Sequence, residues 1–253
     1  MGLFDIFKAK GKGTGGKSGP SERPKPLDKE VARWADAISK RAQNYDRQEA
    51  IEALARIASS DAAGVLLKRF TFQIEPSITD QEEKDSAFRA IVGAGTDALP
   101  AIREFCQRAE SITWPLRMMR ALLTDDAYVG EVLELLARWD TEYDRNPDPK
   151  IQLIATLEEL QDPRIRPAVE RFLEDVHEPT RFHAVSTLFA QEDAEVARPM
   201  VEAYLREEAV RTRNRIAEGL AAKAWPVPEE LREKLDGALP RGFDVVDGVV
   251  RRG

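Results

Sequence analysis

The chain has 253 residues, of which 42% are hydrophobic and 33% are charged, a composition typical of a soluble globular protein with a substantial core. Its apolar runs are interrupted by charges within a few residues, whereas a membrane-spanning helix needs about 20 consecutive apolar residues, so no segment is predicted to cross a bilayer. Of the net charge of −7, residues 1–26 contribute +4 through six basic and two acidic side chains, which leaves an acidic body that disfavours nucleic acid as a partner.

Residues 1–7 carry four large apolar side chains, Leu3, Phe4, Ile6 and Phe7, which share one face if the segment is helical. These apolar residues precede the lysines, the reverse of a secretory signal, so a cytoplasmic location is predicted. Because seven residues are too few for a stable free helix, the segment is expected to order on contact. Three contacts remain open: an anionic membrane surface on the inner side of the membrane, a groove on a protein partner, and the first helices of the same chain.

Residues 8–27 predict a disordered linker. The stretch from 8 to 26 holds five Gly, three Pro and five Lys with almost nothing apolar, a composition that cannot offset the entropy of ordering. By Gly-rich coil scaling such a linker spans roughly 25 Å r.m.s.. A capping helix follows, with Asp28 as its N-cap and apolar residues at helical spacing. These are Val31, Trp34, Ala35 and Ile38.

Internal repetition decides the predicted fold. Six segments share one pattern, in which two adjacent small or apolar residues precede an aliphatic anchor that stands three positions after the second of them. The anchors are Leu54, Ile91, Leu122, Leu157, Leu188 and Leu220. The anchors are 37, 31, 35, 31 and 32 residues apart, which fits two short helices and two turns per unit. Seven positions before the anchor five units carry a basic residue, Arg47, Lys84, Lys150, Arg181 or Arg213, and the third unit has Pro115.

An acidic residue a few positions after each of the first five anchors is expected to cap a second helix. These residues are Asp61, Asp97, Asp126, Asp162 and Asp193. The second helices have apolar stripes of their own, as in the run from Val129 to Leu136.

This unit, over about residues 46–236, resembles the short HEAT-like repeat, as found in phycobilin-lyase-like proteins. The resemblance implies an all-α fold for residues 28–240: a right-handed α-solenoid of about six HEAT-like helical hairpins behind the capping helix, whose inner surface engages a partner. It also implies that the basic row forms a structural ladder that locks the repeats together, rather than a ligand site.

Residues 241–253 predict a small C-terminal β-hairpin. Asp247 and Gly248 suit a type I′ turn, in which both central residues need positive φ, and apolar residues flank them. Because an isolated hairpin is only marginally stable, it is expected to dock on the last repeat, with pairing to an external chain as the alternative.

The sequence offers little catalytic chemistry. HEAT-like deoxyhypusine hydroxylases need several His-Glu pairs for a di-iron centre, whereas this chain has only His177 and His183, so neither a metal site nor a cofactor is predicted. HEAT-like DNA glycosylases work in a basic groove, which the acidic body disfavours. Trp114 and Trp139 are expected to serve packing instead, and Cys106 to be a buried thiol.

The predicted function is therefore a non-catalytic scaffold or adaptor that binds a protein, with residues 1–7 as a hook for the partner or the membrane. A HEAT-like lyase or cofactor chaperone is the alternative, and a glycosylase-like enzyme has less support. Alignment of the buried stripes places Arg103, Glu134, Glu170 and Glu202 in one outward row of the second helices, with Gln107, Arg138, Glu174 and Arg206 a turn further on. This row is predicted to face the concave side and to bind the partner; the alternative is a solvated helix face.

Overall fold

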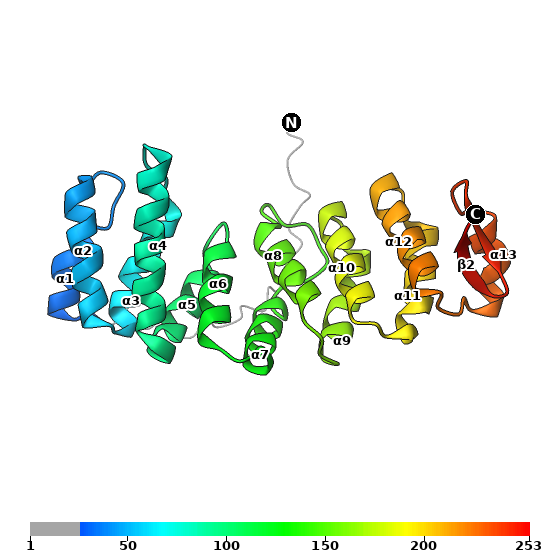
Figure 1. The fold of residues 1–253 in the computed structure, drawn as a ribbon, viewed down its shortest axis with the longest axis horizontal. Coiled ribbons are helices and arrows are strands. Elements are labelled where there is room, and N and C mark those ends of the chain that lie inside the picture. The colour runs from blue at the N-terminus through cyan, green and yellow to red at the C-terminus, as the bar shows by residue number, and fades with distance from the viewer. Residues whose placement is uncertain (1–25) are drawn as a thin grey trace, which may run out of the picture.

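The computed structural model describes residues 26–253, and the apolar residues of the hook, Leu3, Phe4, Ile6 and Phe7, lie outside this part. The described chain is mainly α-helical, with one two-stranded antiparallel sheet at its C-terminal end. Figure 1 shows the helices side by side along an elongated molecule. Among these residues no helix combines the length and the apolar character that crossing a membrane requires.

The helices alternate along the chain between two rows. After α1 (Lys29–Ala35), the first helices are α2 (Asn44–Ile57), α4 (Ser77–Gly93), α6 (Thr113–Leu122), α8 (Asp148–Thr156), α10 (Glu178–Ala190) and α12 (Val210–Lys223). The second helices are α3 (Ser60–Leu67), α5 (Leu99–Cys106), α7 (Asp125–Leu136), α9 (Ile165–Val169), α11 (Ala197–Arg206) and α13 (Arg232–Asp236). Short 3₁₀ segments are η1 (Lys68–Thr71), η2 (Gly95–Ala98), η3 (Leu157–Glu159), η4 (Glu170–Glu174), η5 (Ala194–Val196) and η6 (Glu229–Leu231).

Contacts run between neighbouring units. In the first row α2 packs against α4, α4 against α6, α8 against α10 and α10 against α12, whereas α6 and α8 approach each other less closely. In the second row α3 packs against α5 and α7 against α9. The buried hydrophobic residues of these units form one cluster.

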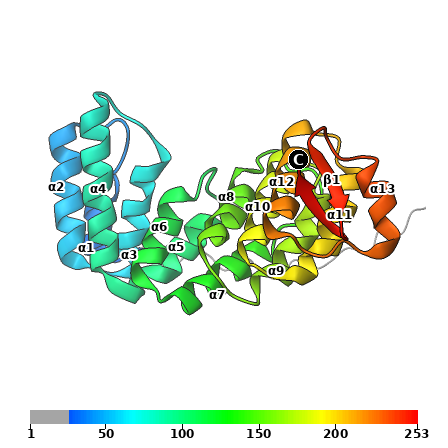
Figure 2. The ribbon, with the colours of Figure 1, turned by 45° about the vertical axis from the view of Figure 1, so that its right-hand side comes forward.

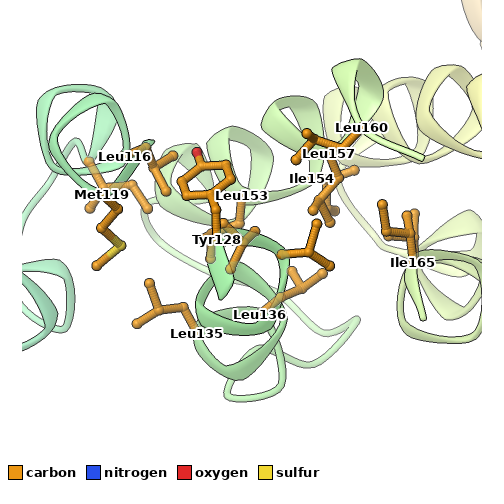
Figure 3. Packing of buried hydrophobic residues seen from close by; sticks show 14 of the residues in the cluster. Leu116, Met119, Tyr128, Leu135, Leu136, Leu153, Ile154, Leu157, Leu160 and Ile165 are labelled. Atoms are coloured by element: carbon orange, nitrogen blue, oxygen red, sulfur yellow. The ribbon is translucent and has the colours of Figure 1, made fainter. Parts of the chain in front are cut away.

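The aliphatic anchors lie in or against that cluster. Leu54, Ile91, Leu157, Leu188 and Leu220 are fully buried, whereas Leu122 in the third unit is only half-buried. Figure 3 shows the packing near this unit, with Tyr128 of α7 lying between Leu116 of α6 and Leu153 of α8. The third unit is thus the irregular one.

Of the five predicted caps two belong to other residues, and α5 and α9 have no side-chain cap, so the predictions for Asp97 and Asp162 were wrong. Ser59 and Thr124 cap α3 and α7 by accepting a hydrogen bond from the backbone N–H three residues later. Asp61 and Asp126 stand one residue inside the first turn, so the prediction that they are N-caps was wrong, because each helix begins earlier. Asp193 does cap, at η5 ahead of α11.

Near the N-terminal end of the described chain, Asp28 caps α1 as predicted, since its side chain accepts from the N–H of Glu30 at 2.8 Å. The helix ends at Ala35, earlier than the periodicity indicated. Ile38 is nevertheless buried beyond the helix end.

The C-terminal hairpin is confirmed. Strands β1 (Phe243–Val246) and β2 (Val249–Arg252) pair antiparallel, and the turn residues Asp247 and Gly248 have φ values of 53° and 78°. It docks on the last unit: β2 packs against α12 and β1 against α13, and Val250 is fully buried. Figure 2 shows the sheet against this end of the molecule.

Candidate binding surfaces

The basic residues that precede the anchors form contacts within the protein. In three consecutive units the basic side chain reaches a carboxylate or carbonyl oxygen that follows it by 25 or 26 residues, just before the next unit for Lys150 and Arg181 and just after α13 of the last unit for Arg213. The connections are Lys150 Nζ to Asp175 Oδ2 at 2.6 Å, Arg181 Nε to Glu207 Oε2 at 2.7 Å, and Arg213 Nη2 to the carbonyl oxygen of Ala238 at 2.9 Å. The expected ladder between units is confirmed for Lys150 and Arg181, whereas the contact of Arg213 lies within the last unit.

At the N-terminal end the ladder has a different form. The buried carboxylate of Glu83 accepts hydrogen bonds from Arg47 Nε at 2.9 Å and from Arg69 Nε at 2.7 Å. Arg69 and Glu83 belong to no repeated position, so the sequence pattern did not indicate them. Lys84 pairs with Asp80 of its own helix at 2.6 Å instead of with another unit.

Asp80 joins the same cluster from the start of α4. Burial raises the pKa of its carboxyl group, but hydrogen bonds from Lys84 and Arg69 and from the backbone N–H of Ile74 outweigh this effect and hold the pKa at about 2. The carboxylate is therefore kept charged by its neighbours, as expected for a structural ion cluster.

Three of the predicted binding residues lie around one groove. Glu170, at the start of η4, and Glu202 and Arg206, on α11, line a hollow of about 530 Å³ between successive second helices, here called the second-helix groove. Its other lining residues are Arg166, Pro167, Arg171, Leu173, Glu174 and Pro199. The lining is thus mixed in charge, with six charged and three apolar residues.

Charges in the second-helix groove form ion pairs at the surface, one within the groove and others with residues beside it. Arg206 Nη2 lies 3.0 Å from Glu174, and both side chains are more than half exposed. Arg198 Nη1 lies 3.6 Å from Glu202. Exposed pairs of this kind are typically worth about 0–1 kcal/mol, so a partner can replace them at little cost.

The other predicted residues lie elsewhere. Arg103 Nε donates to Glu131 of α7 at 2.7 Å, and this hydrogen bond raises the pKa of the guanidinium group. Arg138 lines a separate pocket of about 320 Å³ beside Trp139. Glu134 is exposed on α7. The predicted row is therefore not one continuous site in the structure.

A surface that sequence reasoning missed lies on the first helices. It is a pocket of about 510 Å³ between α4, α6 and α8, here called the first-helix pocket. Its lining residues are Phe88, Thr113, Leu116, Arg117, Arg120, Ala121, Tyr128, Gln152, Ala155, Thr156, Glu159 and Leu160. Pro115, the break in the basic row, was the one sequence signal of an irregular unit here.

The candidate metal-binding or reactive side chains, His177, His183 and Cys106, have surroundings typical of residues with a structural role. His177 Nε2 accepts a hydrogen bond from the backbone N–H of Asp144 at 3.1 Å, and burial lowers the pKa of His183. Cys106 is buried, as predicted, and burial raises the pKa of its thiol to about 12. Within residues 26–253 no three His, Cys, Asp or Glu side chains gather as metal ligands would.

No protein-family model, curated protein or solved structure matches this chain.

Proposed function

We propose that this chain is a non-catalytic scaffold or adaptor, built as a right-handed HEAT-like solenoid of six helical pairs, that binds a protein partner across the second-helix groove. The observation that carries the proposal is the convergence of Glu170, Glu202 and Arg206, from two successive units, on one open groove. A surface of this kind exists only when units stack, so recognition and the repeated fold support each other.

The basic side chains of the ladder are not available to bind a partner. Lys150 is fully buried, and Arg181 Nη2 donates to Glu207 at 2.7 Å, so these basic side chains are committed to joining units. Charges available to a partner therefore come from the outward faces of the helices. In the second-helix groove both signs are present, which favours a partner surface of mixed charge over a uniformly acidic or basic one.

Residues 1–7 complete the proposal as a cytoplasmic hook. Their apolar face, with five lysines in the following linker, suits either an anionic membrane surface or a groove on the partner. The hook would raise the local concentration of the scaffold beside whatever it binds.

Affinity capture from the native host with the full chain as bait, followed by mass spectrometry, tests this function. The matched baits are the triple charge reversal Glu170→Lys, Glu202→Lys, Arg206→Glu in the groove, and a control that reverses the exposed Glu49, Glu52 and Glu82 of the first helices. We expect wild type and control to recover one shared protein and the triple variant to lose it. Equal recovery by all three baits would contradict a partner bound on the second helices.

A further inference from the structure

The third unit departs from its neighbours at the surface of the first helices. Its first helix, α6, has 10 residues, whereas α4 beside it has 17. Pro115 replaces the basic residue of the ladder, and a proline is tolerated here because N–H groups in the first turn of a helix have no intrahelical partner. Figure 2 shows the step down from the long α4 to the short α6.

This step leaves the recess that forms the first-helix pocket. Because α6 and α8 approach each other less closely than the other first helices do, the gap between them is closed from below by Tyr128, whose ring lies between Leu116 and Leu153 in Figure 3. Tyr128 Oη lies 2.9 Å from Thr156 Oγ1, so its polar end is satisfied. Leu116 and Leu160 supply buried apolar surface to the lining.

Arg117, at the edge of the pocket, forms no ion pair within residues 26–253. Its guanidinium lies 4.3 Å from the ring centre of Trp114 and 5.6 Å from that of Phe88. Throughout the described part of the chain, no carboxylate comes within ion-pair distance of it, whereas Arg120 in the same pocket pairs with Asp125. Aromatic faces therefore hold Arg117 in place and leave its hydrogen-bonding edge to solvent.

We infer that the first-helix pocket is a second binding site, which takes an acidic segment of a protein in which a Glu or Asp stands next to a large apolar residue. The carboxylate would accept the two parallel hydrogen bonds that a guanidinium donates, and the apolar side chain would cover Leu116, Ala121 and Ala155. A volume of about 510 Å³ suits a few side chains, and the exposure of Arg117 and Ala121 leaves the pocket open for a passing chain.

This site goes beyond the proposed function, since it lies on the first helices and uses none of the residues of the second-helix groove. Charge complementarity selects the occupant. The guanidinium of Arg117, which has no carboxylate partner among residues 26–253, places a positive charge beside the apolar lining of the pocket, and an acidic segment matches that charge.

Fluorescence anisotropy with the full chain tests the inference. The probe is a fluorescein-labelled twelve-residue peptide with Glu and Phe alternating at its centre and Gly and Ser elsewhere. Two matched peptides replace Glu by Gln, or Phe by Ser. Arg117→Gln removes the cation, and Ala121→Trp fills the recess from an exposed position. Arg89→Gln is the control, because Arg89 is exposed on α4, donates a hydrogen bond to Ser86 Oγ and does not line the pocket.

We expect Arg117→Gln and Ala121→Trp each to weaken binding of the acidic peptide about tenfold or more, and both matched peptides to bind as weakly. Arg89→Gln should stay within about twofold of wild type. Equal binding of the Glu and Gln peptides, equal effects of Arg117→Gln and Arg89→Gln, or no binding at millimolar peptide would each overturn the site. Arg117-dependent binding to phosphatidylserine vesicles without binding of the peptide would overturn the assigned ligand class. Partner capture through the second-helix groove is independent of every one of these results.

Discussion

Lys150 and Asp175 form an ion pair in which neither side chain is exposed to solvent, with Nζ 2.6 Å from Oδ2. Asp144 contacts the same ammonium group at 2.6 Å from the preceding loop. Lys150 stands in the first turn of α8, and Asp175 stands just before α10. The pair therefore ties the start of one unit to the start of the next.

Removing the cation should destabilise the protein strongly. We expect Lys150→Met to lower the free energy of unfolding by about 3–5 kcal/mol, because it leaves the buried Asp175 without its counter-charge. Urea unfolding followed by circular dichroism measures the change. Arg164→Met is the control, since Arg164 is 45% exposed in its pairs with Asp126 and Asp162, and it should cost less than about 1 kcal/mol. Similar losses for the two variants would refute a structural role for the ladder.

The stability contributed by Asp80 should depend on pH. Its pKa of about 2 in the folded protein lies below the value of about 3.9 in an unfolded chain, so this stability is present above about pH 4 and is lost as the pH falls toward 2. We expect Asp80→Asn to be about 1–2 kcal/mol less stable than wild type at pH 7, with the difference closing between pH 4 and 2. Urea unfolding across this range measures it.

The control for that series is Asp85→Asn on the same helix, where the side chain accepts a hydrogen bond from Gln81 Nε2 at 2.9 Å and from no other residue that the structure describes. At pH 7 Asp85→Asn should lower the free energy of unfolding less than Asp80→Asn does. A difference between wild type and Asp80→Asn that stays constant from pH 7 to 2 would be inconsistent with the lowered pKa.

Gly219 in α12 should not accept a side chain. Alanine usually stabilises a helix by about 1 kcal/mol relative to glycine, but here a Cβ would overlap the ring of Phe189, which is buried and stacks on Trp225 with ring centres 5.6 Å apart. We expect Gly219→Ala to cost about 1–3 kcal/mol in thermal or urea unfolding. Gly93→Ala, with nothing within 4 Å, should be neutral or stabilising. A stabilised Gly219→Ala variant would show that the two helices can move apart freely.

The helical periodicity predicted the first helices well because anchors such as Leu54 and Leu157 must be buried in every unit. Helix starts were predicted less well, since capping depends on which residue directly precedes the first turn, and Ser59 takes this position ahead of Asp61.

The candidate sites were only partly predictable. The positions of Glu170 and Glu202 on one groove could be predicted, because the repeat length of the sequence is enough to align the second helices. The first-helix pocket depends on the short α6, and its proposed ligand depends on Arg117 having no carboxylate partner among residues 26–253; both are properties of three-dimensional packing between units.

The hook at residues 1–7 has a direct test in liposome co-sedimentation. If Leu3, Phe4, Ile6 and Phe7 enter an anionic bilayer, the full chain should sediment with phosphatidylserine vesicles, and a version that begins at Leu27 should stay in the supernatant. Added salt should reduce the binding, because the lysines contribute through screened charge. Equal recovery of both versions would remove the membrane from the proposal and leave the protein groove.

The central claim, partner binding in the second-helix groove, is tested most directly by isothermal titration with the protein that affinity capture identifies. The variant Glu170→Lys, Glu202→Lys, Arg206→Glu reverses the three charges that line the groove, and Glu49→Lys, Glu52→Lys, Glu82→Lys reverses three exposed charges on the first helices. The account predicts that the groove variant binds at least about tenfold more weakly and that the control stays within about twofold of wild type. Equal affinities for wild type and the groove variant would contradict it.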